Sequence, residues 1–289
     1  MNEIKKHAFK NDTNIEVEVV DLKRLAKSNN QNLVLPHRTN FYHIFLFENC
    51  SLTHFVDFQP IKIKPWSLLF IDKERVHQFQ PLLKYDGRVL IFTDDFFCIS
   101  DDDTKFLRSA VLFNIAPADA VLNPGKAIFQ KFAAICNSIA EELNVPPDNA
   151  KHMLLKNHLQ NFLLLADREK RKEGYTEPKK GPDLDYTLLF RDLVEANYKT
   201  LKAVSEYSAR IHISEKRLGQ ATAKVLGKAP KEIINERILL EAKRLLVYTN
   251  LSIKELGLQL GFNDPAYFVR YFKKNAKTTP VEFRAKYIK

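Results

Sequence analysis

The sequence predicts a two-domain α+β protein, and three observations support this prediction. Residues 14–95 carry short apolar or alternating runs between turn residues, residues 126–173 show helical periodicity, and residues 184–289 repeat a helix, turn, helix pattern twice. At 289 residues the chain exceeds the usual size of one hydrophobic core. We therefore expect a β-rich N-terminal domain and an all-α C-terminal domain.

The N-terminal strands are predicted from alternation and from apolar runs. The segments with this character are residues 15–20, 42–47, 61–64, 67–71 and 88–93. Turn signals such as Pro60, Pro65 and the Asp86-Gly87 pair lie between them. The pattern indicates an antiparallel barrel or sandwich, and no helix is expected between residues 14 and 95.

Two helices are predicted next. Residues 126–143 and 150–172 place apolar residues at intervals of three and four, with Pro146-Pro147 as a break between them. Two antiparallel helices are the simplest interpretation. Such an apolar stripe can pack on its own domain or on a second copy of the chain, and the pattern leaves both open. Residues 174–183 hold two prolines and two glycines, which is typical of a linker.

The first helix-turn-helix pattern follows an opening helix at residues 186–198. A short helix is expected at residues 203–210, and Ser214 caps a second one that runs to Leu226 and ends at Gly227. Apolar residues at intervals of three and four face its core. Five residues are left on the outer face: Lys216, Arg217, Gly219, Gln220 and Lys224. Each could equally be a plain solvated residue.

The second pattern is separated from the first by one long helix, residues 230–248. Ser252 and Glu255 form a capping box that starts a short helix, which Gly261 ends, and Asp264 before Pro265 starts the next helix. In that helix two phenylalanines four residues apart face inward. The residues on the other side are Ala266, Val269, Arg270 and Lys273, with Pro265 at its start.

This second pattern resembles the C-terminal signature of the AraC family of bacterial transcription regulators. The residues that match are Gly261, Phe262, Asp264, Tyr267, Phe268, Arg270, Phe272, Lys273, Pro280 and Arg284. Lys277 stands where the family commonly has a glycine that closes the second recognition helix, which leaves room for a less regular helix end. The resemblance implies that Lys216, Gly219 and Gln220 of the first motif approach DNA bases or backbone.

The linking helix and the outward residues together predict how DNA is read. Nineteen residues at about 1.5 Å each span roughly 28 Å, which suits two recognition helices in successive major grooves about 34 Å apart. Arg270 is the expected reader of guanine and Lys273 a phosphate contact. Pro265 and Ala266 stand where the family often has polar residues, so they can sense only a thymine methyl or nothing.

The charge distribution favours a polyanionic partner. Residues 184–289 hold 20 Lys and Arg against 11 Asp and Glu, whereas residues 1–183 hold 25 against 24. Such a one-sided excess is typical of phosphate binding. A membrane surface would satisfy the same charge argument, but the apolar residues are committed to helix-turn-helix cores, so no membrane partner is expected.

The remaining composition predicts a soluble cytoplasmic protein. Cys50, Cys98 and Cys136 are widely separated, which indicates reduced thiols and neither a disulfide framework nor a zinc site. The N-terminus lacks the apolar segment of a signal peptide, and no run of eighteen apolar residues occurs.

The AraC-type resemblance extends more loosely to the N-terminal part, residues 1–125, which is similar to a cupin-like sensor barrel. It implies an effector pocket lined by His37, His43, Phe45, Trp66 and His77, and a dimer contact in the helical pair at 126–173. Cupin enzymes hold a metal with histidines and a carboxylate. Here the nearest histidines, His37 and His43, are six residues apart without a suitable glutamate, so no metal or other cofactor is expected.

The sequence therefore predicts a sequence-specific, effector-responsive transcription regulator and not an enzyme. A homodimer bound to double-stranded DNA is expected, with an unknown small-molecule effector and possible contact with RNA polymerase; activation is the commoner outcome in the resembling family. Two alternatives remain open. One is an architectural DNA-binding protein without an effector, and the other is a metal-dependent cupin enzyme fused to a DNA-binding domain.

Overall fold

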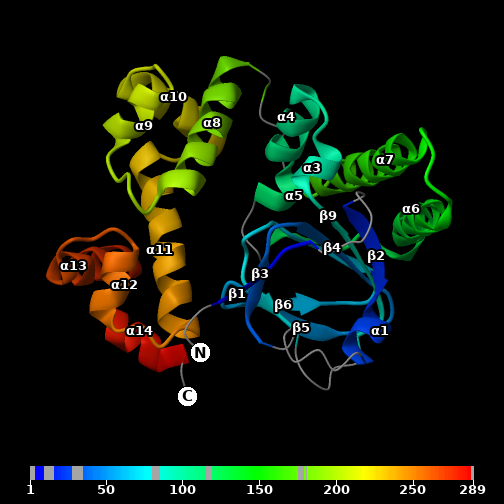
Figure 1. Cartoon of the computed structure of the whole chain (residues 1–289), viewed down its shortest axis with the longest axis horizontal. Coiled ribbons are helices and arrows are strands. Elements are labelled where there is room, and N and C mark those ends of the chain that lie inside the picture. Colours follow the sequence, from blue (N-terminus) through cyan, green and yellow to red (C-terminus); the bar gives the residue numbers. More distant parts are fainter. Residues whose placement is uncertain are drawn as a thin grey trace. The chain divides into compact units, whose positions relative to one another are not determined.

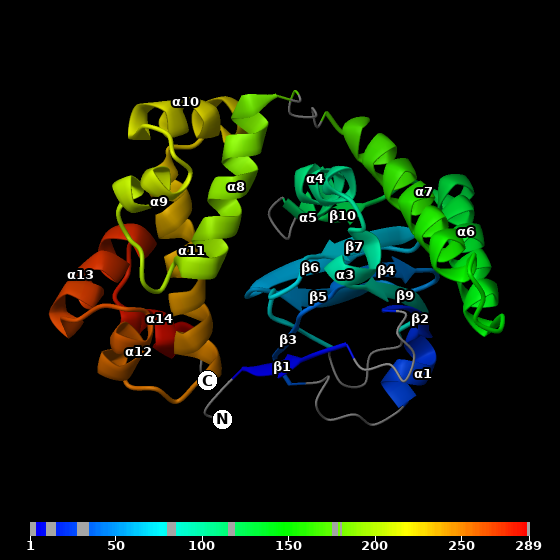
Figure 2. The same cartoon turned by 45° about the horizontal axis from the view of Figure 1, so that its top comes forward.

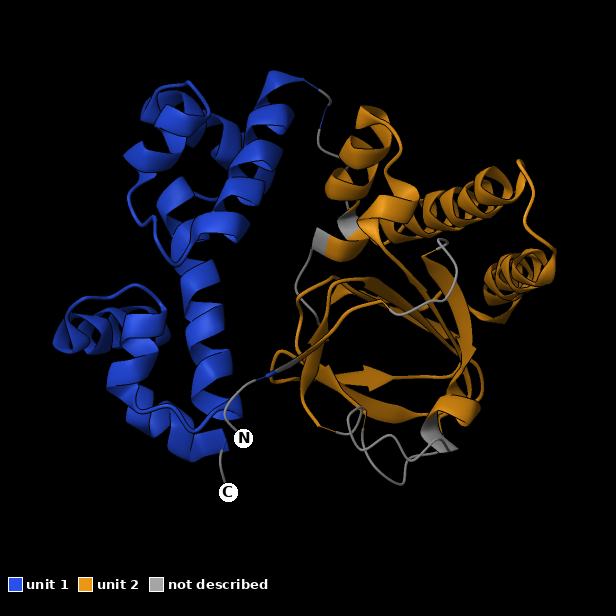
Figure 3. Cartoon of the chain, in the orientation of Figure 1, with its two compact units in different colours: residues 1–4, 178–289 blue, residues 5–177 orange. Residues whose placement is uncertain are grey.

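The computed structural model describes residues 4–9, 16–27, 35–79, 85–114, 119–174, 179 and 181–287. They belong to two compact units, one of residues 5–177 and one of residues 1–4 and 178–289 (Figure 3). The first unit is rich in β-strands and the second is helical, which confirms the predicted two-domain α+β architecture. No helix in these ranges is long and apolar enough to cross a membrane.

The N-terminal unit contains two five-stranded sheets (Figure 1). The first sheet contains, in spatial order, β1 (Lys5–His7), β3 (His37–Thr39), β8 (His77–Gln78), β5 (Leu52–Val56) and β6 (Gln59–Ile63). The second contains β10 (Val121–Leu122), β7 (Ser67–Ile71), β4 (Tyr42–Phe47), β9 (Gly87–Phe92) and β2 (Val17–Asp21). Among the described residues no ladder joins the two sheets, so the strands make a sandwich-like pair and not one closed barrel.

Two local features of this unit differ from the prediction. β1 runs parallel to β3, because nearly thirty residues separate the two strands and no tight hairpin dictates their direction. A six-residue helix, α1 (Leu22–Lys27), lies where no helix was expected. It is fixed by the fully buried Leu22 and by an Asp21 carboxylate that accepts a hydrogen bond from the Arg24 amide at 2.8 Å. Six residues are too few for a helical period to show in the sequence.

The apolar run at residues 42–47 is continuous because β4 is buried on both faces. Alternate side chains of a strand point to opposite faces. Ile44 and Leu46 pack under the helices that cover the second sheet, whereas Phe45 and Phe47 pack in the cluster that includes side chains of the first sheet. β7 is buried throughout in the same way.

Helices cover the outer face of the second sheet (Figure 2). They are α3 (Asp94–Phe97), α4 (Asp101–Ser109), α5 (Val111–Asn114), α6 (Lys126–Asn144) and α7 (Lys151–Arg171). The last two pack side by side through rings such as Phe132 and Phe162, whose centroids are 4.8 Å apart. A buried ion pair of 2.7 Å between Lys156 and Asp103 joins α7 to α4.

The C-terminal unit consists of helices around one core. They are α8 (Pro182–Asn197), α9 (Val204–Arg210), α10 (Glu215–Leu226), α11 (Pro230–Tyr248), α12 (Ile253–Gln259), α13 (Pro265–Ala276) and α14 (Pro280–Tyr287). α8 begins four residues before the predicted start, with Pro182 in its first turn. Of the predicted linker at 174–183, residues 175–178 and 180 lie outside the described residues.

Candidate nucleic-acid interface

Two helix-turn-helix motifs of the same design stand in the C-terminal unit: α9 with α10, here called the first motif, and α12 with α13, the second motif (Figures 1 and 2). Ser214 caps α10 by accepting a hydrogen bond from the Arg217 amide at 3.1 Å. Asp264 caps α13 through two carboxylate oxygens, at 2.8 Å from the Ala266 amide and 3.2 Å from the Tyr267 amide. Each cap satisfies amides that the helix itself leaves unpaired.

One hydrophobic core runs through both motifs. α11 contributes Ile234, Ile238, Ala242, Leu245 and Leu246 to a cluster of buried residues. The same cluster contains Leu218 of the first motif and the two inward phenylalanines of the second, Phe268 and Phe272. α11 is therefore packed against both recognition-type helices and cannot turn without disturbing their cores.

Polar contacts fix α11 further. The Arg237 guanidinium donates to both carboxylate oxygens of Glu195 on α8, at 2.6 and 2.8 Å. The Tyr271 hydroxyl of α13 lies 3.1 Å from the Asn235 side-chain oxygen of α11. Paired guanidinium and carboxylate forks have a defined orientation, so α8 is held to α11 in a specific geometry. The hydrogen bond of Tyr271 ties α13 to the same helix.

The outer face of α10 carries the predicted residues in two groups. Lys216 and Gln220 are exposed, and Gly219 lies beside them with open space around the position of a Cβ atom. Arg217 and Lys224, in contrast, each pair at 2.6 Å with Asp183 of α8. Hydrogen bonds from Lys224 and Arg217 lower the pKa of the Asp183 carboxyl.

The Arg217 guanidinium is further restrained by the Tyr186 ring, 5.0 Å away. Its side chain is only 34% exposed, so Arg217 holds α10 against α8 and has less freedom to reach a ligand. Lys224 is 69% exposed and its pair is well solvated, so it can exchange Asp183 for another anion at little cost.

The outer face of α13 presents cations with more freedom. The Arg270 side chain is 70% exposed, and its contact with Asp264 is a long 3.6 Å. Lys273 is exposed, and among the described residues no acidic side chain pairs with it. Ala266 is exposed, whereas Pro265 and Val269 are half-buried. This face thus offers an exposed guanidinium and an exposed amine beside small apolar side chains.

Three residues near these faces were not singled out from the sequence as contact residues. Tyr267, matched to the family only as a signature residue, is 53% exposed and presents an aromatic ring on α13. Lys274 is exposed next to Lys273, and a run of two lysines in the last turn was a visible signal for it. Asp183 had no such signal, because its partners lie more than thirty residues away on another helix.

In the N-terminal unit the structure brings together four of the five residues predicted to line a pocket. His37, His43 and His77 are buried, with ring centroids 4.6 Å apart for His37 and His77 and 4.7 Å for His43 and His77. Phe45 stacks on His43 at 5.7 Å. His54, which was not assigned to the pocket, joins them, with its Nε2 atom 3.4 Å from His77 Nδ1.

These buried imidazoles are held neutral. Burial is the main cause that lowers the pKa of His37 to about 4 and those of His43 and His54 to about 3. Within the described part of the chain, His43 Nδ1, His54 Nδ1 and His77 Nε2 have no hydrogen-bond partner. In those same ranges no group of three or more histidine, cysteine or acidic residues has an arrangement that could hold a metal ion.

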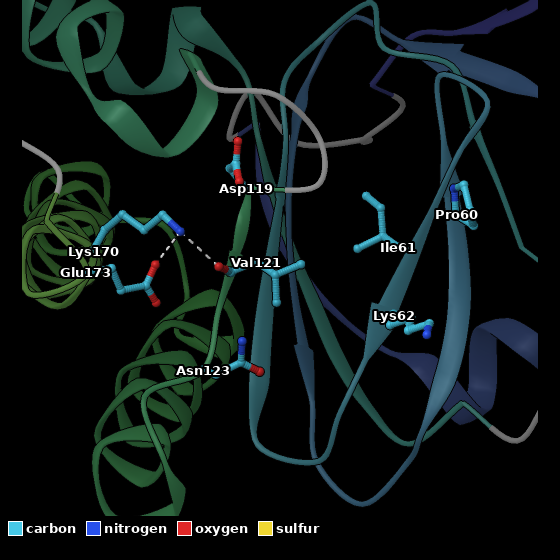
Figure 4. Close-up of a pocket in the computed structure, with 8 residues that line it drawn as sticks. All are labelled: Pro60, Ile61, Lys62, Asp119, Val121, Asn123, Lys170 and Glu173. Carbon is cyan, nitrogen blue, oxygen red and sulfur yellow. Dashed lines mark hydrogen bonds and ion pairs between the residues drawn. The ribbon is translucent and has the colours of Figure 1, made fainter.

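The fifth residue, Trp66, lies elsewhere. Its ring packs edge-on against Phe129 of α6 at 5.5 Å, below the Lys126 ammonium. A separate polar pocket of about 430 Å³ lies between β6 and β10 (Figure 4). The Lys170 ammonium donates to Glu173 and to the Val121 carbonyl at its rim, so this lysine already has hydrogen-bond partners.

Comparisons with known proteins concern mainly the C-terminal unit. The family described as a helix-turn-helix domain matches residues 207–286. The uncharacterised HTH-type transcriptional regulator YisR of Bacillus subtilis (strain 168) is 30% identical over 91 residues, which are 32% of each chain. The lactose operon transcription activator of Staphylococcus xylosus is 28% identical over 93 residues, which are 32% of this chain and 33% of that protein. The matches thus span about a third of these relatives.

A solved structure of a transcriptional regulator from Chromobacterium violaceum, described as having an AraC-type DNA-binding domain, is also similar. It is 26% identical with a TM-score of 0.33, over 36% of this chain and 94% of that chain. The family match begins within α9 and includes α10, α12 and α13, and the signature residues of the second motif lie within it. Residues 207–286 therefore form a helix-turn-helix domain of a transcription-regulator type, similar to AraC-type DNA-binding domains.

Proposed function

We propose that the protein is a sequence-specific DNA-binding transcription regulator that reads two successive major grooves with α10 and α13. The observation that carries this proposal is the pair of capped, cation-bearing helices held by one helix in one core. α11 has 19 residues, about 28 Å at 1.5 Å each, which suits grooves one turn apart. A helix that enters a groove needs small residues for close approach and donors for bases, and both faces supply such residues.

The roles of the outward residues follow from their freedom. Arg270 is the proposed guanine reader, since its guanidinium is exposed and its contact with Asp264 is long. Gln220 and Lys216 are the proposed base or phosphate contacts of the first motif. Lys273 and Lys224 are proposed to contact phosphates, and Arg217 to support α10 from behind. Ala266 and Val269 line the groove side of α13 as small apolar residues.

Selection of random duplexes at several salt concentrations tests this proposal. The full chain is expected to select a DNA motif that spans two helical turns. One protein molecule bound to that motif should protect the same length of DNA from nuclease. A motif of one turn would show that one of the two helix-turn-helix motifs is only structural. Recovery of no motif at any salt concentration would leave an architectural DNA-binding protein as the better function.

We further propose an effector site at His37, His43, Phe45 and His77, which makes the regulator ligand-responsive. His37, His43, His54 and His77 form a buried histidine cluster, and ring nitrogens of three of them have no hydrogen-bond partner among the described residues. This supports the site, because a buried polar group without a partner is costly. A screen for ligands that raise the melting temperature tests the site. A ligand whose shift survives both His77→Phe and His43→Phe binds elsewhere.

Homodimerisation through α7 is proposed because Met153, Leu154 and Leu164 on that helix are 46%, 43% and 47% exposed. Sedimentation of the full chain without DNA should give a dimer at micromolar concentrations, and a monomer would contradict this part. We also propose that the protein lies in the cytoplasm and activates transcription, with a contact to RNA polymerase. Reporter expression in cells with and without the protein gives the sign of regulation.

A further inference from the structure

The two motifs are joined at a second place besides α11, through the side chain of Lys202. This residue lies in the loop between α8 and α9. Its ammonium donates to the carbonyl oxygens of Tyr198 at 3.1 Å and Lys199 at 3.0 Å, both in the first half of the domain. It also donates to the Leu260 carbonyl of the second motif at 2.8 Å. Its Nζ atom lies 4.9 Å from the centre of the Phe262 ring, in the turn of that motif.

The backbone of Lys202 is itself fixed. Its amide donates to a Glu206 carboxylate oxygen at 3.0 Å, and its carbonyl accepts a hydrogen bond from Lys231 Nζ at 2.7 Å. The backbone of Lys202 is therefore held by α9 on one side and by α11 on the other. A long side chain anchored at its base loses less freedom when its tip binds.

The backbones of the two motifs approach each other closely at the same place. A Cβ atom added to Gly261 would lie 1.8 Å from the Lys199 carbonyl oxygen. The loop of the first half and the turn of the second motif are thus in direct contact, and the Lys202 ammonium lies at the edge of that contact. An ammonium has three N–H donors, which equals the number of carbonyl acceptors around it.

The charge state of Lys202 fits this arrangement at neutral pH. Burial, with a smaller contribution from Lys231, lowers the pKa of the Lys202 amine to about 8. Below that pKa the amine keeps its third proton, so each carbonyl can receive one donor. No acidic side chain among the described residues forms an ion pair with its Nζ atom, which leaves backbone carbonyls as its hydrogen-bond acceptors.

We propose that Lys202 is a positioning residue that locks the turn of the second motif to the first half of the domain, and so restricts the DNA sites accepted by the domain to one spacing between the two grooves. This rests on the proposed function, since spacing matters only if both motifs read DNA. One inserted base pair moves the second groove by about 3.4 Å and rotates it by about a tenth of a turn. A locked pair of motifs cannot follow that movement, whereas a pair without the three hydrogen bonds of the Lys202 ammonium can bend at the junction between the first half of the domain and the turn of the second motif.

Binding of the full chain to duplexes that carry one two-turn unit, with zero, one or two base pairs inserted at its centre, tests the proposal. For the wild type we expect one inserted base pair to lower affinity about tenfold or more, because one motif loses its contacts. For Lys202→Met the same insertion should lower affinity by no more than about threefold. An equal loss in both proteins would overturn the proposal.

Lys228→Met is the matched control. Lys228 pairs with Glu236 at 2.7 Å within the exposed surface of the same domain, so the control removes one charge without touching the junction. It should bind more weakly at every spacing but keep the wild-type loss on insertion. A reduced loss in the control would assign the effect to charge and not to Lys202.

A measurement without DNA separates this inference from the proposed function. Nitroxides at Ala223 of α10 and Lys274 of α13, both exposed, report the distance between the recognition helices in a Cys98→Ser background where Cys50 and Cys136 are buried. The distance distribution should be narrow with Lys202 and about twofold broader with Lys202→Met, since the interaction energy of a charged side chain with carbonyls is lost. Unchanged width would overturn the lock whether or not the protein binds DNA.

Discussion

The two helix-turn-helix motifs share one backbone design but place their glycines at opposite points. In the first motif the turn after α9 uses His212 at φ 59°, and the end of α10 uses Gly227 at φ 65°. In the second motif the turn uses Gly261 at φ 76°, and the end of α13 uses Lys277 at φ 61°. The hydrogen bonds of the turns correspond as well, with Ile213 N to Ser208 O at 3.1 Å and Phe262 N to Gly257 O at 2.9 Å.

The exchange shows that left-handed backbone alone does not demand glycine. His212 and Lys277 are exposed, and histidine adopts this conformation more readily than most residues. Gly261 is different because its backbone lies against the Lys199 carbonyl oxygen. The need for glycine in the second turn therefore comes from the packing of one half of the domain on the other, and the first turn carries no such packing.

The largest effect is expected from Gly261→Ala. The added Cβ atom meets the Lys199 carbonyl oxygen and the residue is forced to keep a left-handed conformation, so unfolding free energy should fall by about 2–4 kcal/mol. Hydrogen exchange of α11 amides, followed by mass spectrometry, measures this loss locally. His212→Ala is the matched control and should lose far less. Equal losses in both variants would show that backbone conformation, and not the contact, decides.

The next effect distinguishes the cations of the two recognition-type helices. Arg270→Ala should weaken binding to the selected DNA by about 1–3 kcal/mol, because the guanidinium that we propose reads guanine is lost. Binding to random DNA should weaken less. An equal loss of binding free energy on selected and random DNA would make Arg270 a phosphate contact. Arg217→Ala is the matched change in the first motif; since Arg217 is bound to Asp183, it should change base preference little. Binding titrations at one fixed salt concentration compare the two variants, each with selected and with random DNA.

Much of the C-terminal unit could be predicted because its signals are local. Ser214, Gly227, Ser252 and Asp264 mark helix ends within one turn of where they act; α10 and α11 have the predicted bounds, and α13 has the predicted start. The replacement of a glycine by Lys277 left room for a less regular helix end. The structure closes α13 there as it closes α10 at Gly227, with the Lys277 amide bonded to the Lys273 carbonyl at 3.0 Å.

Features that depend on distant partners could not be predicted. The role of Asp183 depends on α10, and the parallel pairing of β1 depends on a strand about thirty residues later. Trp66 was predicted to line the pocket. In the structure it directly precedes β7, and its ring lies against Phe129 of α6. His54 joined the histidine cluster because β5 pairs with β8, a register that spacing alone does not give.

A smaller effect tests the helix ends. Gly227→Ala should lower stability by about 1–2 kcal/mol, although the space around it is open, because the residue must stay left-handed. Lys277→Gly should raise stability by about 0.5–1 kcal/mol for the same reason, reduced by the greater freedom of glycine in the unfolded chain. Hydrogen exchange in α10 and α13 measures both. Stability changes of opposite sign in the two variants would show that both helix ends depend on the left-handed conformation. A loss of stability in both would show that the Lys277 side chain has contacts of its own.

The smallest effect concerns the fifth residue of each recognition-type helix, Gly219 in α10 and Val269 in α13. A glycine inside a helix is less stable than alanine, and nothing surrounds the Cβ position of Gly219, so Gly219→Ala should stabilise α10 by about 0.5–1 kcal/mol. The same change should weaken DNA binding if α10 approaches the duplex closely at that point. Val269→Ala should not gain stability. A variant at Gly219 that is more stable and binds DNA as well as the wild type would show that close approach in the first motif occurs elsewhere on α10.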